Sequence, residues 1–274
     1  MCPSYVQAKL LIARVLVRRP QCGLAATAFV GARIILGTGA PAIEDGVLLV
    51  DGTSIVAVGP REKVQIPADA QTVGLDGKFI IPGLISAHSH LGLCQGAAGP
   101  QPDHYNRQNV QHQLEQYEGY GVTSVLSLGC NADVLYTWKE EQKRGQLAGA
   151  DFFTADRGFG VKSGAPPFPL PDQIYTPADP AEARAEVDQT AARKPDLMKL
   201  WVDDLFGKSP KLSPDIYHAI IPEAHRIRDD SHPNGYRVAA HLFYLADVKS
   251  LVAAGVNILA QSVRDQPVDD ELLP

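Results

Sequence analysis

The sequence has few cysteines, no cluster of basic residues and no long apolar segment, and each of these absences argues against a class of protein. Its four cysteines (Cys2, Cys22, Cys94 and Cys130) include no Cys-x-x-Cys pair, so we interpret them as free thiols and not as a disulfide framework. No run of lysine and arginine occurs and the net charge is −6, which argues against nucleic acid as a partner. No stretch is long enough to span a membrane.

Residues 1–26 stand apart from the predicted domains. Their apolar stretch at 10–17 is interrupted by Arg14, and Arg18 and Arg19 follow it, whereas a signal peptide has its positive charges in front. Residues 24–26 nevertheless resemble a cleavage site. A degenerate signal peptide and an upstream start that extends the chain both fit. We expect a cytoplasmic protein, with export through a degenerate signal as the alternative.

Residues 27–78 predict a small β-domain. Short β-type runs occur at 28–35, 46–50 and 54–58, and Asp51-Gly52 between the last two has the chemistry of a tight hairpin turn. Further short runs at 71–73 and 78–80 complete what we expect to be a small antiparallel unit.

The most informative segment is the apolar run at 79–90, which ends in His88-Ser-His90. Alternate side chains of a β-strand face the same side, so a strand here presents two imidazoles to one point, as a metal ion requires. Pro82-Gly83 changes the direction of the chain before the histidines. Two histidines in a solvated loop are the alternative explanation of this spacing.

After His90 the sequence alternates between helical and strand patterns, which indicates parallel βα units. Six units can be counted between residues 79 and 274. Helices are predicted at 106–120, 133–144, 180–193, from 214 and at 245–254, with Asp179 as N-cap and Pro222 expected to kink or shorten its helix. The Gly/Pro-rich stretch at 158–171 is either an active-site lid or an ordinary surface loop.

Two of the predicted strands carry unusual residues. Lys199 lies in the middle of the apolar run 197–202, where burial is costly unless the amine is used; the alternative is a lysine that reaches solvent at the strand end. His241 ends the run 237–241 and, given the upstream His-x-His, is a candidate third imidazole ligand. Asp203 and Asp204 are expected to cap the loop after the lysine strand.

This order of features resembles the amidohydrolase superfamily, in particular its imidazolonepropionase-like branch, which includes metal-dependent dipeptidases. The resemblance covers residues 28–274 and is strongest in Lys199-Leu-Trp-Val-Asp-Asp, in the run that begins His241-Leu-Phe-Tyr, and in Ser262-Val-Arg-Asp. It implies a (β/α)8 TIM barrel in residues 79–274, with the active site at the carboxyl ends of its strands. The preceding 27–78 would be part of a β-sandwich.

The resemblance also implies a set of ligands and a reaction. His88 and His90 would bind a divalent metal, Lys199 would be carboxylated and bridge two ions, and His241 would bind the second ion. Zinc suits imidazole and carboxylate ligands, with one or two ions bound, and would provide hydroxide near neutral pH to attack a carbonyl. Tyr244 and Arg264 could contact substrate, although a surface salt bridge from Arg264 to Asp265 is the alternative.

The sequence departs from this family in two ways. Gln261 stands where the family has a histidine ligand at the end of strand six, and a glutamine carbonyl is a poor substitute for imidazole on zinc. We also expect strands seven and eight, the strand-eight aspartate that shuttles the proton, and the closing strands of the β-sandwich to be absent. About six of eight βα units would then be present.

Two functions follow for this chain, and nothing in the sequence supports a third, a binding module that uses the barrel face without metal. The first is a metal-dependent hydrolase of C–N bonds in an amide, cyclic amide or dipeptide, with a small-molecule partner. The second is a catalytically inactive remnant, because of Gln261 and the absent aspartate. A six-stranded partial barrel has two open edges and an exposed apolar interior, so we expect poor solubility or pairing with another chain, which includes a homo-oligomer.

Overall fold

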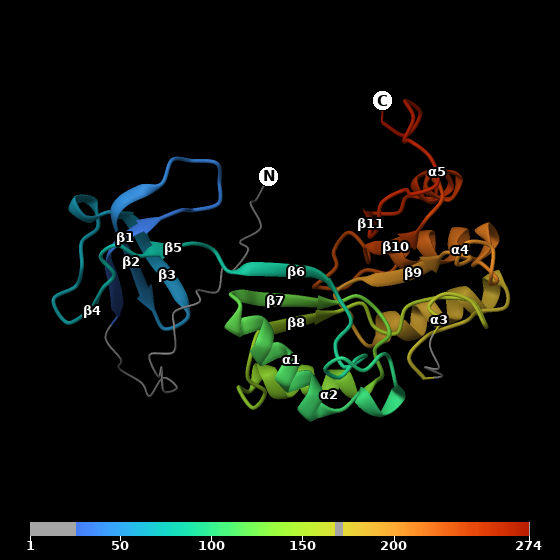
Figure 1. Cartoon of the computed structure of the whole chain (residues 1–274), viewed down its shortest axis with the longest axis horizontal. Coiled ribbons are helices and arrows are strands. Elements are labelled where there is room, and N and C mark those ends of the chain that lie inside the picture. The colour runs from blue at the N-terminus through green and yellow to red at the C-terminus, as the bar shows by residue number, and fades with distance from the viewer. Residues whose placement is uncertain (1–25, 168–171, 274) are drawn as a thin grey trace. The chain divides into compact units, whose positions relative to one another are not determined.

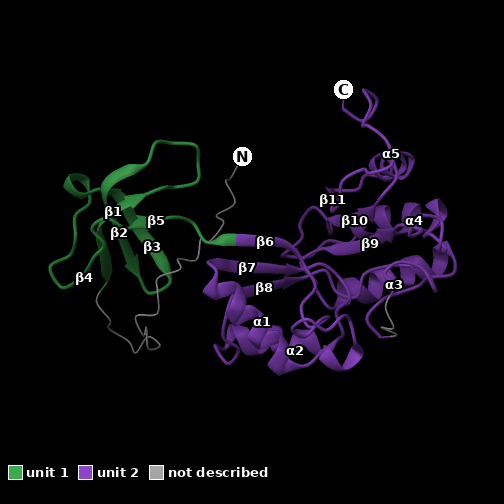
Figure 2. Cartoon of the chain, in the orientation of Figure 1, with its two compact units in different colours: residues 1–84 green, residues 85–274 purple. Residues whose placement is uncertain are grey.

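The computed structural model describes residues 26–167 and 172–273. The chain divides into two compact units at Leu84/Ile85 (Figure 2), slightly later than the predicted end of the β-domain at residue 78. The difference arises because β5 (Phe79–Ile80) pairs with β1 (Thr27–Ile34) of the first unit. The proposed export signal lies outside the described residues. Among the helices that are described, none is both long enough and apolar enough to cross a bilayer.

The first unit is one five-stranded sheet in the order β3-β2-β1-β4, with β5 also paired to β1. β2 (Ile43–Asp51) is antiparallel to β1 and to β3 (Ser54–Pro60), and the predicted turn at Asp51-Gly52 joins β2 to β3. β4 (Gln71–Gly74) and β5 run parallel to β1, so the expectation of an antiparallel unit is wrong for these two strands. The chain crosses from β3 at one edge to the other side of β1, and such a crossover makes the new strand parallel.

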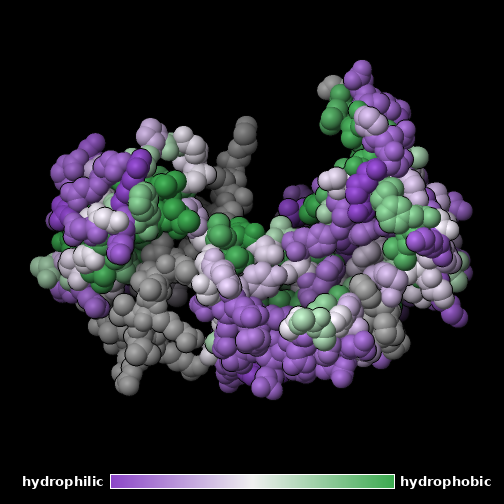
Figure 3. Space-filling view, viewed as in Figure 1, coloured by the Kyte–Doolittle hydropathy of each residue, from purple (hydrophilic) through white to green (hydrophobic). Residues whose placement is uncertain are grey.

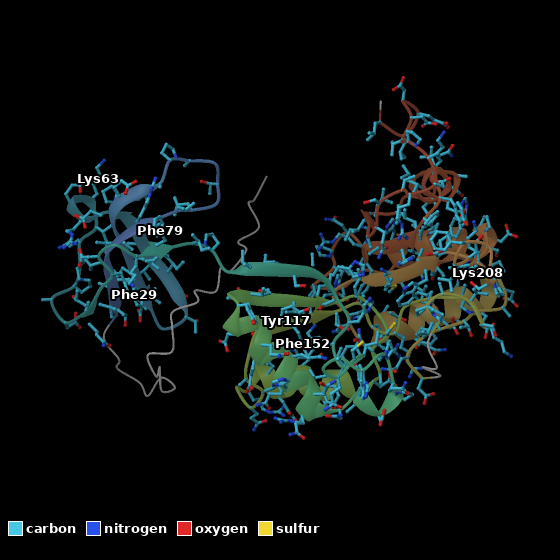
Figure 4. All side chains as sticks on the ribbon, viewed as in Figure 1. Phe29, Lys63, Phe79, Tyr117, Phe152 and Lys208 are labelled. Atoms are coloured by element: carbon cyan, nitrogen blue, oxygen red, sulfur yellow. The ribbon has the colours of Figure 1, made fainter. Side chains whose placement is uncertain are left out.

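Strand β1 is buried on both faces of this sheet. Ala28 and Val30 belong to one apolar cluster, and Phe29, labelled in Figure 4, belongs to the other. The register shifts beside Gly31, which has a φ of +91°. This irregularity changes the alternation, so that Ala32 joins the cluster of Phe29.

The second unit begins with a three-stranded sheet in the order β6-β7-β8, covered by two helices (Figure 1). Phe152 of β8 packs with Trp138 of α2 and with Tyr117 of α1 in one apolar cluster, and Phe152 and Tyr117 lie on the helical side of the sheet in Figure 4. The elements are β6 (Leu84–Ser89), α1 (Arg107–Gly119), β7 (Val122–Ser127), α2 (Val134–Lys143) and β8 (Asp151–Thr154).

The rest of the second unit contains a sheet in the order β11-β10-β9 and the helices α3, α4 and α5. The predicted N-cap is confirmed, because the Asp179 carboxylate accepts hydrogen bonds from the amides of Ala181 and Glu182 at 2.8 and 2.9 Å. The elements are α3 (Pro180–Ala192), β9 (Met198–Val202), α4 (Pro214–Arg226), β10 (Val238–Leu242), α5 (Leu245–Ala253) and β11 (Ile258–Leu259).

Helix α4 continues through Pro222 to Arg226, so the expectation that Pro222 shortens it is wrong. Proline inside a helix costs about 3 kcal/mol. Burial of apolar residues on both sides of it, among them Ile220, Ile221 and Ala224, offsets that cost.

The two sheets of the second unit are joined through Phe159, in the stretch that was expected to be a loop or a lid. Phe159 forms a parallel bridge with Leu200 of β9, and its amide donates to the Lys199 carbonyl at 2.8 Å. The six strands therefore follow one another in chain order. This arrangement agrees with the predicted partial barrel of about six βα units.

Strands β6 and β11 are the outer strands of this series in the described part of the chain. The apolar side chains of Leu84 and Ile85 in β6 are 53% and 65% exposed, and apolar surface is visible where β6 begins (Figure 3). A hollow of about 490 Å³ lies between the carboxyl end of β6 and helix α1, lined in part by His90, Tyr117 and Tyr120. Exposed apolar edge strands of this kind template pairing with other chains.

We expect the purified chain to self-associate through β6, and Ile85→Lys to reduce this association because an edge lysine blocks strand pairing. Val252→Lys is the matched control, since Val252 is an exposed apolar residue on helix α5. Light scattering against concentration measures the effect. A wild-type chain that stays monomeric with a sharp two-state melt would contradict the prediction.

Candidate metal and catalytic site

His88 and His90 lie at the carboxyl end of β6, where the His-x-His pattern placed them. Their ring centroids are 5.4 Å apart. The Nδ1 atom of His90 is 3.2 Å from the Gly129 carbonyl oxygen; a carbonyl can only accept, so this contact assigns the ring proton to Nδ1 and leaves the Nε2 lone pair free. Burial lowers the pKa of His90 to about 4, which keeps the ring neutral, as a metal ligand must be.

Lys199 is fully buried in β9, and its Nζ atom has no hydrogen-bond partner among the described residues. The alternative of a lysine that reaches solvent is therefore wrong. Burial lowers the pKa of Lys199 to about 7, because a charged amine without a partner is poorly solvated there. A substantial fraction of this amine is neutral, and thus nucleophilic, near pH 7.

The side chain of Trp201 fixes the surroundings of this lysine. Its ring centroid is 5.5 Å from the Lys199 amine, and the ring lies against two glycines with positive φ, Gly129 and Gly158. A Cβ atom at either glycine would come within 2.4 Å of the indole and 3.3 Å of the Lys199 side chain. The segments that follow β7 and β8 can therefore approach β9 this closely only with glycine at these two positions.

His241 lies near the end of β10, and its Nε2 atom is 2.8 Å from the carboxylate Oδ2 of Asp203. Burial lowers the pKa of His241, the hydrogen bond to Asp203 opposes this shift, and the charge of Lys199 adds to it. Burial and Lys199 likewise lower the pKa of His88. The three histidines and Lys199 thus interact electrostatically with one another.

Gln261 follows β11, and its Nε2 atom is 3.5 Å from Nε2 of His88. Its Oε1 atom is buried without a hydrogen-bond partner among the described residues. The structure thus places Gln261 just after β11 with its amide nitrogen toward His88.

Within the described residues, no three His, Cys, Asp or Glu side chains form a group that could hold a metal ion. The donors fit a metal only if Lys199 joins them. Its unpartnered amine is the observation that fits, because carboxylation would replace an unsolvated amine by two anionic oxygens beside imidazoles. A site of imidazoles and carboxylate suits zinc.

The structure shows contacts for both predicted substrate residues. The Tyr244 hydroxyl donates to Asp204 at 2.7 Å, so this side chain is tied to the loop after β9. The Arg264 guanidinium lies over the ring of Phe243 at 4.6 Å. No ion pair between Arg264 and Asp265 occurs in the described part of the chain, and Asp265 instead accepts from the Leu245 amide. The alternative explanation of a surface salt bridge is therefore wrong.

Sequence reasoning missed the hydrogen bond between Asp203 and His241 and the contacts of Trp201 with two glycines. Asp203 was assigned to capping its own loop, which it does through the Leu205 amide at 2.8 Å, but its second oxygen reaches His241. The strand-end position of Asp203, beside a strand that carries a candidate ligand, is a signal that could have been used. The contact of Trp201 with Gly129 and Gly158 joins three strands and has no local signal.

No protein-family profile matches this chain, but several known proteins are similar in sequence to parts of it. An uncharacterized protein of Mycobacterium tuberculosis is 29% identical over 221 residues, which cover 78% of this chain and 53% of that protein. An imidazolonepropionase of Salmonella schwarzengrund is 25% identical over 122 residues, 44% of this chain and 30% of that protein. The chain spans about half the length of the M. tuberculosis protein.

Solved structures match most of the chain. A Bifidobacterium longum protein described as a prolidase has a TM-score of 0.73 at 24% identity, over 91% of this chain and 56% of that one. Molinate hydrolase has 0.72 at 18% identity, over 91% and 61%. A Xaa-Pro dipeptidase with bound methionine in its active site has 0.69 at 20% identity, over 85% and 60%. At these identities the likeness establishes the fold.

We expect Gly158→Ala to displace the Trp201 indole, because the new methyl group would lie 2.4 Å from it. The variant should lose about 2–3 kcal/mol of stability, of which the positive φ alone accounts for about 1–2 kcal/mol. Trp201 emission should shift to the red, measured in a Trp138→Phe background because the chain has two tryptophans.

Gly96→Ala is the matched control, since Gly96 also has a positive φ but an added Cβ would meet nothing within 4 Å. This variant should show the backbone cost without the emission shift. Equal stability losses and unchanged emission in both variants would show that Trp201 is not held in this way.

Proposed function

We propose that this protein is a metal-dependent amidohydrolase that cleaves a C–N bond of an amide, cyclic amide or dipeptide. The observation that carries this proposal is the Lys199 amine, which is fully buried and without a hydrogen-bond partner among the described residues, and whose charge adds to burial in lowering the pKa values of His88, His90 and His241. A buried amine left unpaired is costly. The cost is removed if the amine is converted to a metal-binding carboxylate.

The conversion needs only carbon dioxide. The neutral Lys199 amine forms a bond from Nζ to the carbon and releases one proton, so the product is a carbamate with one negative charge and two oxygens. The lowered pKa of Lys199 of about 7 makes the neutral amine available. The neighbouring histidines, whose pKa values are lowered by burial and by the charge of Lys199, then offer lone pairs near this anion.

When bound, a divalent metal, most simply zinc, supplies the Lewis acidity that activates water and polarises the substrate carbonyl. Lys199 and the imidazoles of His88, His90 and His241 would hold it. The Trp201 ring, wedged between two glycines, excludes water from the stem of Lys199 and limits its rotamers. These residues would hold one or two ions.

The substrate class is proposed from the neighbours and from two side chains. The structural neighbours include a prolidase complexed with N-methylphosphonate-L-proline and a phenylurea hydrolase, whose names denote C–N bond cleavage in small molecules. Arg264 has no carboxylate partner among the described residues, and its charge adds to burial in lowering the pKa of His241. Such an unpaired cation suits a substrate that carries an anionic group beside the carbonyl under attack. Tyr244 would contact the same substrate.

A second candidate function is that of a non-catalytic remnant, and Gln261 is the observation that favours it. Its amide nitrogen points to His88, and an amide nitrogen has no lone pair for a metal. Asp265 and Asp269 are engaged with the Leu245 amide and with Lys249. Neither is available as the proton-shuttling aspartate of the family.

The test of the proposed function is metal retention and hydrolysis by the purified chain, loaded with Zn²⁺ and bicarbonate. Lys199→Met should lose at least about tenfold in zinc affinity, because the anionic ligand is gone. Lys63→Met, at an exposed lysine of the first unit (Figure 4), is the control and should bind as the wild type does. ¹³C-bicarbonate should give a carbamate signal in the wild type and not in Lys199→Met.

Turnover of a panel of Xaa-Pro dipeptides, cyclic amides and aryl ureas by the loaded chain would establish catalysis. Zinc retention without turnover of any of them would favour the non-catalytic candidate. Absence of both zinc retention and the carbamate signal would contradict the proposed function.

We expect Gln261→His to tighten zinc binding, because it places an imidazole where a glutamine now faces His88. One added protein ligand should raise the affinity by about 10- to 100-fold, measured by chelator competition. Gln189→His on the exposed side of α3 is the control for zinc binding by a histidine added away from the site. Equal affinities of all three proteins would show that residue 261 does not reach the metal.

A further inference from the structure

Asp203 combines deep burial with a contact to a candidate ligand. Its side chain is 7% exposed and its Oδ2 atom lies 2.8 Å from Nε2 of His241. The other oxygen, Oδ1, accepts the Leu205 amide at 2.8 Å. Both oxygens are thus held, one by the backbone of its own loop and one by the imidazole.

This contact determines the state of the His241 ring. A carboxylate can only accept, so Nε2 of His241 must carry the hydrogen. In the neutral ring the lone pair is then on Nδ1. A carboxylate on the far nitrogen of a metal-binding histidine fixes its tautomer and orientation and raises its basicity.

The charge of Asp203 is a second, independent observation. No lysine or arginine of the described residues forms an ion pair with Asp203. Among those residues, His241 is the one basic side chain within ion-pair distance of it. A buried carboxylate without a cation is costly. A cation bound on the other side of His241 would compensate this charge through the ring.

The adjacent Asp204 shows what a purely structural carboxylate does in the same loop. It accepts the Gly207 amide at 2.8 Å and the Tyr244 hydroxyl at 2.7 Å. These bonds hold a turn in which Leu205 and Phe206 have φ values of +53° and +65°. Within the described residues Asp204 forms no hydrogen bond or ion pair with a histidine. Of the two neighbouring aspartates, Asp204 therefore holds the loop, whereas Asp203 also reaches His241.

We propose that Asp203 is a positioning residue that holds His241 with its hydrogen on Nε2 and its Nδ1 lone pair toward a divalent cation, an inference that rests on the proposed function. The residue acts on the site only through His241. Its removal therefore changes cation affinity without removing a ligand.

The first test needs no variant. Long-range ¹H–¹⁵N spectra of the histidine rings in the metal-free chain report the tautomer, and His241→Gln identifies the His241 signal among the eight histidines. We expect hydrogen on Nε2 of His241. Hydrogen on Nδ1 would overturn the inference.

The second test is zinc affinity by chelator competition. Asp203→Ala should lower it by about 10- to 100-fold, and Asp203→Asn by less, because asparagine keeps an oxygen acceptor for Nε2. Asp204→Asn, the matched control, should leave zinc affinity unchanged, since Asp204 holds the loop and the Tyr244 hydroxyl and has no hydrogen bond to a histidine among the described residues. If Asp203→Ala does not fold, the comparison of Asp203→Asn with Asp204→Asn still decides.

The outcomes separate this inference from the proposed function. A wild type that retains no zinc overturns the proposed function and with it the role of Asp203. A wild type that retains zinc, with Asp203 variants of equal affinity, overturns the inference about Asp203 alone. Equal losses in the Asp203 and Asp204 variants would also overturn it, because a loop effect would then account for both.

Discussion

The burial of the Lys199 amine is the constraint on which the rest of the candidate site depends. An apolar strand surrounds it, Trp201 covers its stem, and no described group solvates its nitrogen. Because that burial disfavours the charged amine, it also leaves the amine able to react with carbon dioxide. The same burial lowers the pKa of the neighbouring histidines, so that one physical cause prepares both kinds of donor.

Much of this could be predicted from the sequence because the relevant signals are local. His-x-His on a strand, a lysine inside an apolar run and a histidine at a strand end each concern a few consecutive residues, and the structure places these residues near one another. The alternation of strands and helices gave the six βα units for the same reason. Asp179 as an N-cap is a local signal as well, and its hydrogen bonds are present.

What could not be predicted depends on pairing between distant segments. The parallel direction of β4 follows from a crossover around the sheet, and the link of Phe159 to β9 joins residues on either side of α3. The Asp203–His241 hydrogen bond spans 38 positions of the sequence. Pro222 shows the opposite problem, a strong local signal that tertiary burial overrides.

The two sides of the candidate site differ in how firmly the fold supports them. Every residue of β9 is buried, whereas four of the six residues of β6 are exposed. Lys199 and His241 thus belong to strands inside a sheet, while His88 and His90 lie at the end of β6, which in the described part of the chain pairs on one side only, with β7. A cation held by residues of both strands would tie the edge strand to the interior. Part of its binding free energy would then appear as added stability of β6 against local unfolding.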